Sequence, residues 1–255
     1  MDIVYTIAGF VVGTIVGLTG VGGGALMTPF LVLYGVPPAI AVGTDLLYAA
    51  TTKSGAVWLH GRNHTVRWRI VGLLALGSLP ASAVSILTLS RAGGRQEALI
   101  TTTLGVSLVL TSLVLLFRER LHRFGAQRWP AARRLFRRRT ALLTVLAGIV
   151  LGTLVTLSSV GAGALGAAVL IVLYRRLPAV TIVGTDLAHA LPLALLAGLG
   201  HLHLGTVDFT LLGSLLLGSL PGIALGTRIG IHLPEIHMRR ALAMMLLAVG
   251  IGFTI

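Results

Sequence analysis

The sequence predicts an all-α polytopic membrane protein made of two inverted-topology repeats, each of about five helical segments. The chain has 255 residues, of which 55% are hydrophobic and only 11% are charged. An ordinary soluble domain carries about 25% charged residues, so the charged groups here are too few to cover a water-soluble fold. At about 20 residues for each span, the length accommodates roughly ten apolar segments with short loops.

Ten apolar segments lie along the chain, five on each side of a basic stretch. The first five cover residues 3–19, 25–35, 38–60, 70–89 and 96–117, and the last five cover residues 140–157, 164–174, 178–200, 207–231 and 241–255. No Lys or Arg precedes the first segment, so we expect a membrane segment there and not a cleaved signal peptide. We expect a first transmembrane repeat at residues 1–117, a basic cytoplasmic linker at 118–139 and a second transmembrane repeat at 140–255.

Short identities at a constant spacing relate the two halves. Val42-Gly43-Thr44-Asp45-Leu46 returns in the second half as Val183-Gly184-Thr185-Asp186-Leu187. Gly77-Ser78-Leu79-Pro80 returns at the same spacing as Gly218-Ser219-Leu220-Pro221. Identities of four and five residues at one spacing indicate an internal duplication.

The arginine positions orient the segments. Nine Arg lie at 118–139, and the basic loops of membrane proteins stay in the cytoplasm. With five segments in each half, 17 Arg fall in inside loops at 61–69, 118–139, 175–177 and 228–240, and two fall outside at 90–95. An odd number of segments inverts the second half relative to the first, as in many secondary transporters. Four spans in each half would make the repeats parallel and place some of these Arg outside.

A glycine-rich break joins the two short segments that open each half, so we expect two helical hairpins. The breaks are Gly20-Val21-Gly22-Gly23-Gly24 and Ser158-Ser159-Val160-Gly161-Ala162-Gly163. Each precedes a helix start, where free N–H groups and the helix dipole favour an anion. The alternative is tight helix packing, as the spacing of Gly9, Gly13 and Gly17 indicates for the first segment. The predicted substrate-binding residues are Thr19, Gly22, Gly23, Gly24, Ser158, Ser159, Gly161 and Gly163.

Asp45 and Asp186 are the only acidic residues deep in the predicted spans. A charge at the bilayer centre costs about 2.5–3.5 kcal/mol on insertion scales, so such a residue usually has a function. Each is a candidate proton carrier, and His189 can share the helix face of Asp186. In the alternative interpretation, Asp45 and Asp186 cap a helix that restarts at these positions, with Thr44 and Thr185 in support.

Lys53, the only lysine, lies within a span. It is a candidate ligand for the anion. Its long side chain could equally extend to the inner membrane surface, since His60 at that end of the segment is seven residues away.

Several classes of protein and site are not expected. The net charge of +13 does not indicate a nucleic-acid partner, because the Arg residues lie in loops between apolar spans. The chain has no cysteine, and no other ligand cluster supports a metal at His201-x-His203, so we expect no metal site. No nucleotide-binding or hydrolase motif is present, so we expect neither an enzyme nor a cofactor.

These motifs resemble the sulfite exporter TauE/SafE family, also called the TSUP family. The resemblance covers nearly the whole chain, and it implies a transporter of the cell inner membrane for sulfite or related organosulfonates. The second half departs from the pattern because no proline matches Pro29, so the two hairpins need not be equivalent. The resemblance rests on Gly17-Leu18-x-Gly20-x-Gly22-Gly23-Gly24 with Pro29, on Ala41-Val42-Gly43-Thr44-Asp45 with Lys53-Ser54-Gly55, and on Gly77-Ser78-Leu79-Pro80.

We therefore expect a secondary transporter with an anion site at the membrane midplane, between the tips of the two hairpins. Rocking of one repeat against the other would alternate access, and the transport could be coupled to protons. The partners are a small anion of the sulfite, thiosulfate or sulfonate class and the lipid bilayer, and a homo-oligomer is left open. A passive anion channel and, less favoured, an intramembrane enzyme are the alternatives.

The topology can be tested by cysteine labelling, since the native chain contains no cysteine. In intact cells, an impermeant thiol reagent is expected to label Val36→Cys and His203→Cys, because both positions lie in predicted outside loops. Gln127→Cys should stay unlabelled. Strong external labelling of Gln127→Cys would contradict the predicted orientation.

Overall fold

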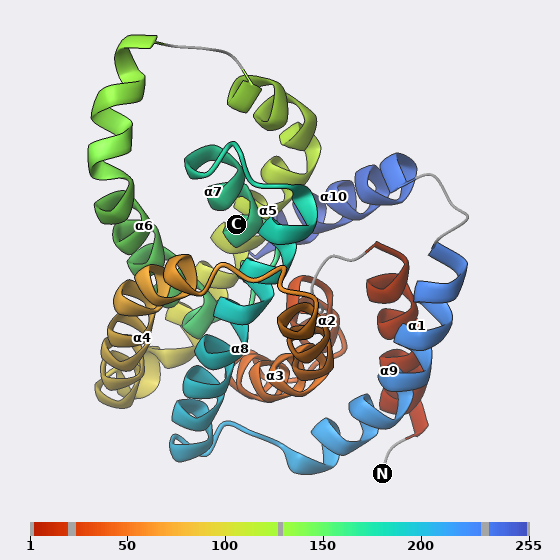
Figure 1. Cartoon of the computed structure of the whole chain (residues 1–255). Helices are drawn as coiled ribbons and strands as arrows, with labels where there is room; N and C mark the ends of the chain where they lie inside the picture. Colours follow the sequence, from red (N-terminus) through yellow and green to blue (C-terminus); the bar gives the residue numbers. More distant parts are fainter. Residues whose placement is uncertain (1–2, 20–23, 127–129, 231–234, 254–255) are drawn as a thin grey trace.

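The structure is a computed structural model, and it describes residues 3–19, 24–126, 130–230 and 235–253. In this part of the chain every regular element is helical (Figure 1). The elements are α1 (Ile3–Thr19), α2 (Gly24–Leu33), α3 (Pro38–Arg62), α4 (Trp68–Arg91), the short 3₁₀ turn η1 (Gly93–Arg95), α5 (Gln96–Ala126), α6 (Pro130–Ser158), α7 (Ala164–Leu173), α8 (Ala179–His203), α9 (Phe209–Gly230) and α10 (Glu235–Gly252).

The helices confirm a multi-pass membrane protein. Each predicted apolar segment lies on one helix; α5, α6 and α10 extend beyond the predicted bounds, and the other described ends differ by a few residues. Helix α3 is as long as α8, at 25 residues, but it is less apolar because it carries Asp45 and Lys53. Five described stretches are long and apolar enough to span a bilayer: Trp68–Arg91, Gly93–Phe117, Arg139–Ser158, Ala179–His203 and Phe209–Ile229.

The basic stretch at 118–139 differs from the predicted loop, because it is helical over most of its length. Helix α5 continues beyond its apolar part to Ala126, and α6 begins at Pro130, before its own apolar part. Arg, Leu and Ala are good helix formers, and Pro is well suited to the first position of a helix. The two helices therefore continue past their apolar parts before the chain reverses.

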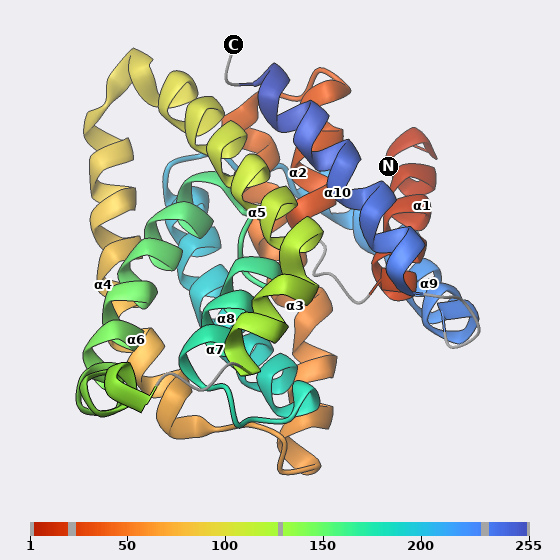
Figure 2. The same cartoon turned by 90° about the horizontal axis from the view of Figure 1, so that it is seen from above.

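Long helices of the first half pack mainly on helices of the second half. Helix α1 lies along α9, α4 along α6, α3 against α8 and α5 against α10. The pairing of α1 with α9 is visible in Figure 1, and that of α5 with α10 in Figure 2. The two halves are therefore interleaved, and the hydrophobic clusters between the helices contain residues of both.

Glycines allow these pairs to approach closely. A Cβ added at Gly13 of α1 would lie 2.6 Å from the backbone oxygen of Ser219 in α9. Lipid provides no hydrophobic force between helices, so membrane helices associate through close contact of small residues. The packing interpretation of the α1 glycines is confirmed. Such contacts involve Gly9, Gly13, Gly17, Gly218, Gly222 and Gly226 between α1 and α9, and Gly77, Gly148 and Gly152 between α4 and α6.

Helices α3 and α8 cross near the middle of the molecule (Figure 1). Gly43 of α3 faces His201 near the end of α8, and Gly184 near the start of α8 faces His60 at the end of α3. The two helices are therefore antiparallel. They carry most of the buried ionisable groups among the residues whose exposure is described.

A pair of glycines in α4 tests the role of close packing. A Cβ at Gly77 would collide with the backbone oxygen of Val145 in α6, whereas at Gly72 it would meet nothing within 4 Å. We expect Gly77→Ala to lower the free energy of unfolding by about 1–3 kcal/mol, as overpacking does. Gly72→Ala should leave it unchanged or raise it slightly, because Ala is the better helix former. Thermal unfolding in detergent measures both, and an equal loss of stability would contradict the packing role.

Candidate functional site

The break between α6 and α7 has an irregular backbone that leaves N–H groups free. Gly161 and Gly163 have φ angles of 115° and 124°, values that side chains with a Cβ rarely adopt. Within the described residues, the N–H groups of Gly161, Ala162 and Gly163 donate no hydrogen bond. Three backbone donors are thus available just before the first turn of α7, where the helix dipole adds positive potential.

The two serines of this break have different environments. The Ser158 hydroxyl donates to the Leu154 carbonyl at 2.6 Å and accepts from the Val160 N–H at 3.2 Å, so it is used to hold the end of α6. Ser159 is 3% exposed, and its Oγ makes no hydrogen bond in the described chain. The Ser159 hydroxyl faces the Asp45 carboxylate. Of the two predicted serine ligands, only Ser159 has a hydroxyl that is not used to hold the end of α6; it lies beside the Asp45 carboxylate, its one polar neighbour in the described chain.

Ser159 also has a strained backbone. Its φ angle is 56°, in the left-handed region that non-glycine residues seldom occupy. Strain of this kind persists only where surrounding contacts hold the residue in place, and it is often found at binding sites. Ser159 is therefore the most unusual of the predicted ligands in the part of the chain that is described.

The corresponding break of the first half cannot be compared with it. Residues 20–23 lie outside the described residues, and so the predicted ligands Gly22 and Gly23 lie outside them too. Thr19 is the last residue of α1 and Gly24 is the first residue of α2.

Asp45 is buried inside an uninterrupted helix. Helix α3 runs from Pro38 to Arg62 without a break, so the alternative that Asp45 caps a restarted helix is wrong. The Thr28 hydroxyl of α2 donates a short hydrogen bond to Asp45 Oδ2, and Oδ1 has no hydrogen-bond partner among the described residues. One carboxylate oxygen is thus available to a proton or a ligand.

Asp186 has the corresponding position in α8, with different partners. Helix α8 is also continuous, from Ala179 to His203, so a capping role is wrong here as well. Asp186 Oδ1 has no hydrogen-bond partner in the described chain. It lies against Gly166 of α7, where a Cβ would collide with it. Each buried aspartate thus faces the short helix of its own half.

Thr44 and Thr185 do not support a cap of their own helix either. Thr44 Oγ1 accepts from the Asp208 N–H at 3.1 Å, and Thr185 Oγ1 accepts from the Arg67 N–H, also at 3.1 Å. Asp208 and Arg67 immediately precede α9 and α4. Thr44 therefore connects α3 to the start of α9, and Thr185 connects α8 to the start of α4.

Lys53 lies inside the molecule, near the crossing of α3 and α8. Its side chain is only 5% exposed, so the prediction that it extends to the membrane surface is wrong. The ammonium group interacts electrostatically with Asp186 and Asp45. His189, on the same helix as Asp186, also interacts electrostatically with Lys53. Its Nε2 lies 2.8 Å from Ser78 Oγ of α4. Four ionisable groups thus form one buried cluster.

Sequence reasoning missed Tyr48, which belongs to the same cluster. Tyr48 and His189 occupy corresponding positions of the two halves, as Ser78 and Ser219 do. The Tyr48 hydroxyl and Ser219 Oγ are both buried without a hydrogen-bond partner in the described chain. The constant spacing of the repeat could have identified Tyr48, because it matches His189, a residue that the sequence had already singled out.

His201 is not arranged as a metal ligand. Its Nδ1 lies 2.9 Å from Thr206 Oγ1, and its Nε2 lies 3.0 Å from the Thr156 carbonyl oxygen. With both ring nitrogens occupied by hydrogen bonds, the imidazole has no lone pair left for a metal. No group of three or more potential metal-binding side chains occurs among the described residues.

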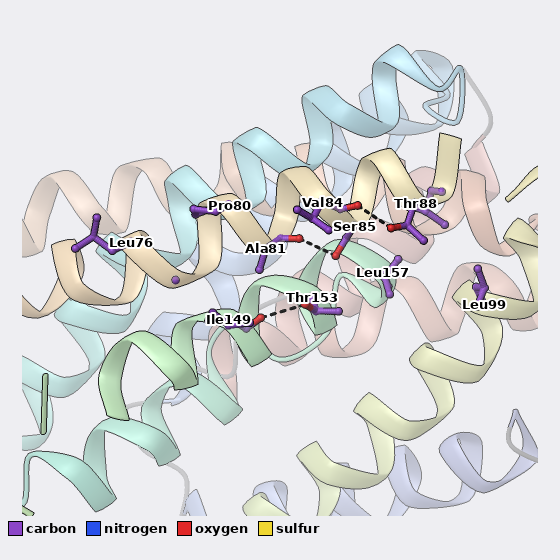
Figure 3. Close-up of a pocket in the computed structure, with 12 residues that line it drawn as sticks. Leu76, Pro80, Ala81, Val84, Ser85, Thr88, Leu99, Ile149, Thr153 and Leu157 are labelled. Atoms are coloured by element: carbon purple, nitrogen blue, oxygen red, sulfur yellow. Dashed lines mark hydrogen bonds between the residues drawn. The ribbon is translucent and has the colours of Figure 1, made fainter. Parts of the chain in front are cut away.

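A groove of about 470 Å³ lies away from this cluster, between α4, α5 and α6 (Figure 3). Its lining is mostly apolar, with Leu76 and Val84 largely exposed. Ser85, Thr88 and Thr153 contribute hydroxyls, but each donates to a carbonyl of its own helix. The groove therefore offers an anion no free donor from these side chains, and its exposed apolar lining suits lipid.

A family model described as "Sulfite exporter TauE/SafE" matches residues 5–253. The chain belongs to the sulfite exporter TauE/SafE family. It is thus a membrane transporter of that family. No solved structure matches it significantly.

Relatives from two bacteria carry transporter names. "Probable membrane transporter protein YjnA" of Bacillus subtilis (strain 168) is 41% identical over 233 residues, which is 90% of each chain. "Probable membrane transporter protein YdhB" of the same strain is 26% identical, over 91% of this chain and 92% of the relative. A "Probable membrane transporter protein" of Xylella fastidiosa (strain 9a5c) is 28% identical, over 86% and 81%. The TauE/SafE resemblance predicted from the motifs is confirmed.

The unequal hydrogen bonding of the two serines has a measurable consequence. Ser158→Ala leaves the buried Val160 N–H without its partner, so we expect the free energy of unfolding to fall by about 1–3 kcal/mol. Ser159→Ala leaves no backbone group without a partner and removes only the hydroxyl beside the Asp45 carboxylate, so the loss of stability should be smaller. Thermal unfolding of the purified variants compares them. A larger loss for Ser159→Ala than for Ser158→Ala would contradict this description of the break.

Proposed function

We propose that this TauE/SafE protein is a secondary transporter that moves a small sulfur-containing oxyanion or organosulfonate across the cytoplasmic membrane by alternating access. The observation that carries the proposal is the α6–α7 break, where free N–H groups and the hydroxyl of buried Ser159, which lies beside the Asp45 carboxylate, precede a helix start. The family to which the chain belongs is named for a sulfite exporter, which supports the substrate class.

The break suits a small oxyanion better than a larger or cationic substrate. An oxyanion accepts several hydrogen bonds at once, and the N–H groups of residues 161–163 supply donors without a buried cation. The half-buried residues there are small, Ala162 and Gly163, so the anion can approach the backbone closely. A bulkier side chain at either position would block that approach.

Asp45 gives the site a means of coupling to protons. The Ser159 hydroxyl faces the Asp45 carboxylate, so an ionised Asp45 would repel an anion bound at the break. A proton on the unpartnered Oδ1 of Asp45 removes that repulsion. The anion and the proton would therefore bind together and be carried together.

Alternating access follows from two repeats of inverted topology, which we place at residues 1–117 and 140–255 with the basic linker inside. The proposal is supported by the corresponding helices α3 and α8, which cross in antiparallel directions. It is supported as well by contacts that occur twice with the halves exchanged. The packing of α1 on α9 corresponds to that of α6 on α4, and the hydrogen bond between Thr44 and Asp208 corresponds to that between Thr185 and Arg67. Two inverted repeats that rock on each other can open a central site to either side in turn.

Figure 2 is consistent with the orientation inferred from the arginines. The α3–α4 and α7–α8 connections lie at one end of the bundle, and the α4–α5 turn and the C-terminus lie at the other. The first two connections and the helix ends next to them carry five of the Arg residues assigned to the inside, at 62, 67, 69, 175 and 176.

Transport by reconstituted protein tests the function. We expect saturable uptake of radiolabelled sulfite into proteoliposomes, accelerated by a pH gradient, with competition by thiosulfate or sulfonates. Ser159→Ala should weaken sulfite binding about tenfold or more, because a hydrogen bond to a charged group contributes about 1.5–3 kcal/mol. Ser85→Ala is the matched control, since this hydroxyl lies in the apolar groove and bonds its own helix.

The outcomes separate the competing functions. Flux that rises linearly with sulfite concentration and ignores the pH gradient would indicate a passive channel. Uptake of none of sulfite, thiosulfate, sulfate or sulfonates would contradict the proposed substrate class. Loss of binding in Ser85→Ala, with Ser159→Ala unaffected, would place the site in the groove of Figure 3.

A further inference from the structure

The groove of Figure 3 exists because α4 and α5 diverge. The two helices are joined by the turn η1 and separate from it (Figure 2). Helix α5 packs mainly against α6, α7 and α10, and hardly against α4. Side chains of α6, among them Thr153 and Leu157, line the space that remains between the two helices. The described helices thus leave an apolar groove open on the outer side of the bundle.

The groove has the length and the lining of a site for one acyl chain. Its α4 residues run from Leu76 to Leu89, which is about 20 Å along a helix that rises about 1.5 Å per residue. The hydrocarbon core of a bilayer is about 30 Å thick, so each leaflet is about 15 Å deep. The three hydroxyls in the lining bond to their own helices. An acyl chain would therefore meet apolar surface over the depth of one leaflet.

Two arginines lie at one end of this groove. Figure 3 shows Thr88 and Leu99 at the same end and Leu76 at the other. Arg91 follows Thr88 by three residues, and Arg95 precedes Leu99 by four, spacings that put residues on one side of a helix. Arg91 is the last residue of one candidate span, and Arg95 is in the first turn of the next. Both arginines are therefore at the level of the lipid headgroups.

Neither arginine has a partner within the described part of the protein. The side chains of Arg91 and Arg95 are exposed, and they make no hydrogen bond or ion pair there. Glu97, which is close to them in the sequence, pairs with neither. In the orientation proposed above they are the two loop arginines on the outside, where basic residues are usually few. Two unpaired guanidinium groups at this level suit a phosphate, which they bind by charge-assisted hydrogen bonds.

We propose that this groove binds an anionic phospholipid, with one acyl chain between α4, α5 and α6 and the phosphate group at Arg91 and Arg95. The groove provides the shape and the arginines provide the complementary charge. Basic sites beside apolar surface between membrane helices bind the headgroups of anionic lipids. A zwitterionic lipid could place the same chain in the groove, but its headgroup has no net charge for the arginines to attract.

A fluorophore in the groove tests the proposal. Val84→Cys provides the attachment site, because Val84 lines the groove and the chain has no cysteine of its own. In bilayers of phosphatidylcholine, phosphatidylglycerol with brominated chains should quench this fluorophore more strongly than brominated phosphatidylcholine at the same mole fraction. Leu217→Cys on α9 is the matched control, since Leu217 is 56% exposed against 60% for Val84 and lies outside the groove. It should show no preference, and equal quenching by the two lipids at Val84→Cys overturns the proposal.

Substitution of the arginines tests the phosphate contact. Arg91→Gln and Arg95→Gln should each lower the preference for phosphatidylglycerol at Val84→Cys about fivefold, as expected for one basic residue near an anionic headgroup. Both side chains are exposed and unpaired in the described chain, so the fold should be unaffected. Arg69→Gln, exposed at the other end of α4, is the control and should leave the preference unchanged. An undiminished preference in the Arg91→Gln/Arg95→Gln variant overturns the proposal.

Other occupants of the groove give different results, and each of these overturns the proposal. Relief of the quenching by millimolar glycerol phosphate would show a site for a free small anion at the arginines. Absence of quenching by both lipids would show that no lipid chain enters the groove. If Ala81→Phe, within the groove, then converted a dimer to a monomer in mass photometry, the groove would be an interface between two copies of the chain.

Discussion

Close backbone contact between helices of opposite halves is the constraint on which the rest of this structure depends. In lipid, apolar side chains gain nothing by leaving the solvent, so helices associate where small residues let their backbones meet. Glycines provide this contact between α1 and α9, between α4 and α6, and where α3 crosses α8. Because each of these contacts joins one half to the other, the glycine-lined helix faces of either half find their packing partners only in the other half.

This interleaving keeps charged groups away from lipid at the centre. Helices α3 and α8 carry Asp45, Lys53 and Asp186, and all three are buried. Charges inside a membrane are tolerated where they face protein and one another. The crossing that glycines make possible therefore also encloses the charged groups of α3 and α8 within protein.

The two halves have diverged within a common plan. Thr44 and Thr185 make reciprocal hydrogen bonds to the starts of α9 and α4. The aspartates do not match in this way, since Thr28 donates to Asp45 whereas Gly166 lies against Asp186. The duplication has therefore kept the positions of the buried aspartates but not the groups that contact them.

The sequence by itself determined the apolar segments, the duplication, the glycine ladder of α1 and the family, because span length, repeat spacing and motifs are local properties of the chain. It could not decide whether Asp45 caps a restarted helix, whether Lys53 reaches the surface, or which of Ser158 and Ser159 holds the end of α6. The tertiary structure decided these points, since the helix continues through Asp45, the crossing with α8 encloses Lys53, and Ser158 bonds to Leu154 and Val160. Burial and hydrogen-bond partners at these residues depend on segments brought together only by folding, many of them far apart in the chain.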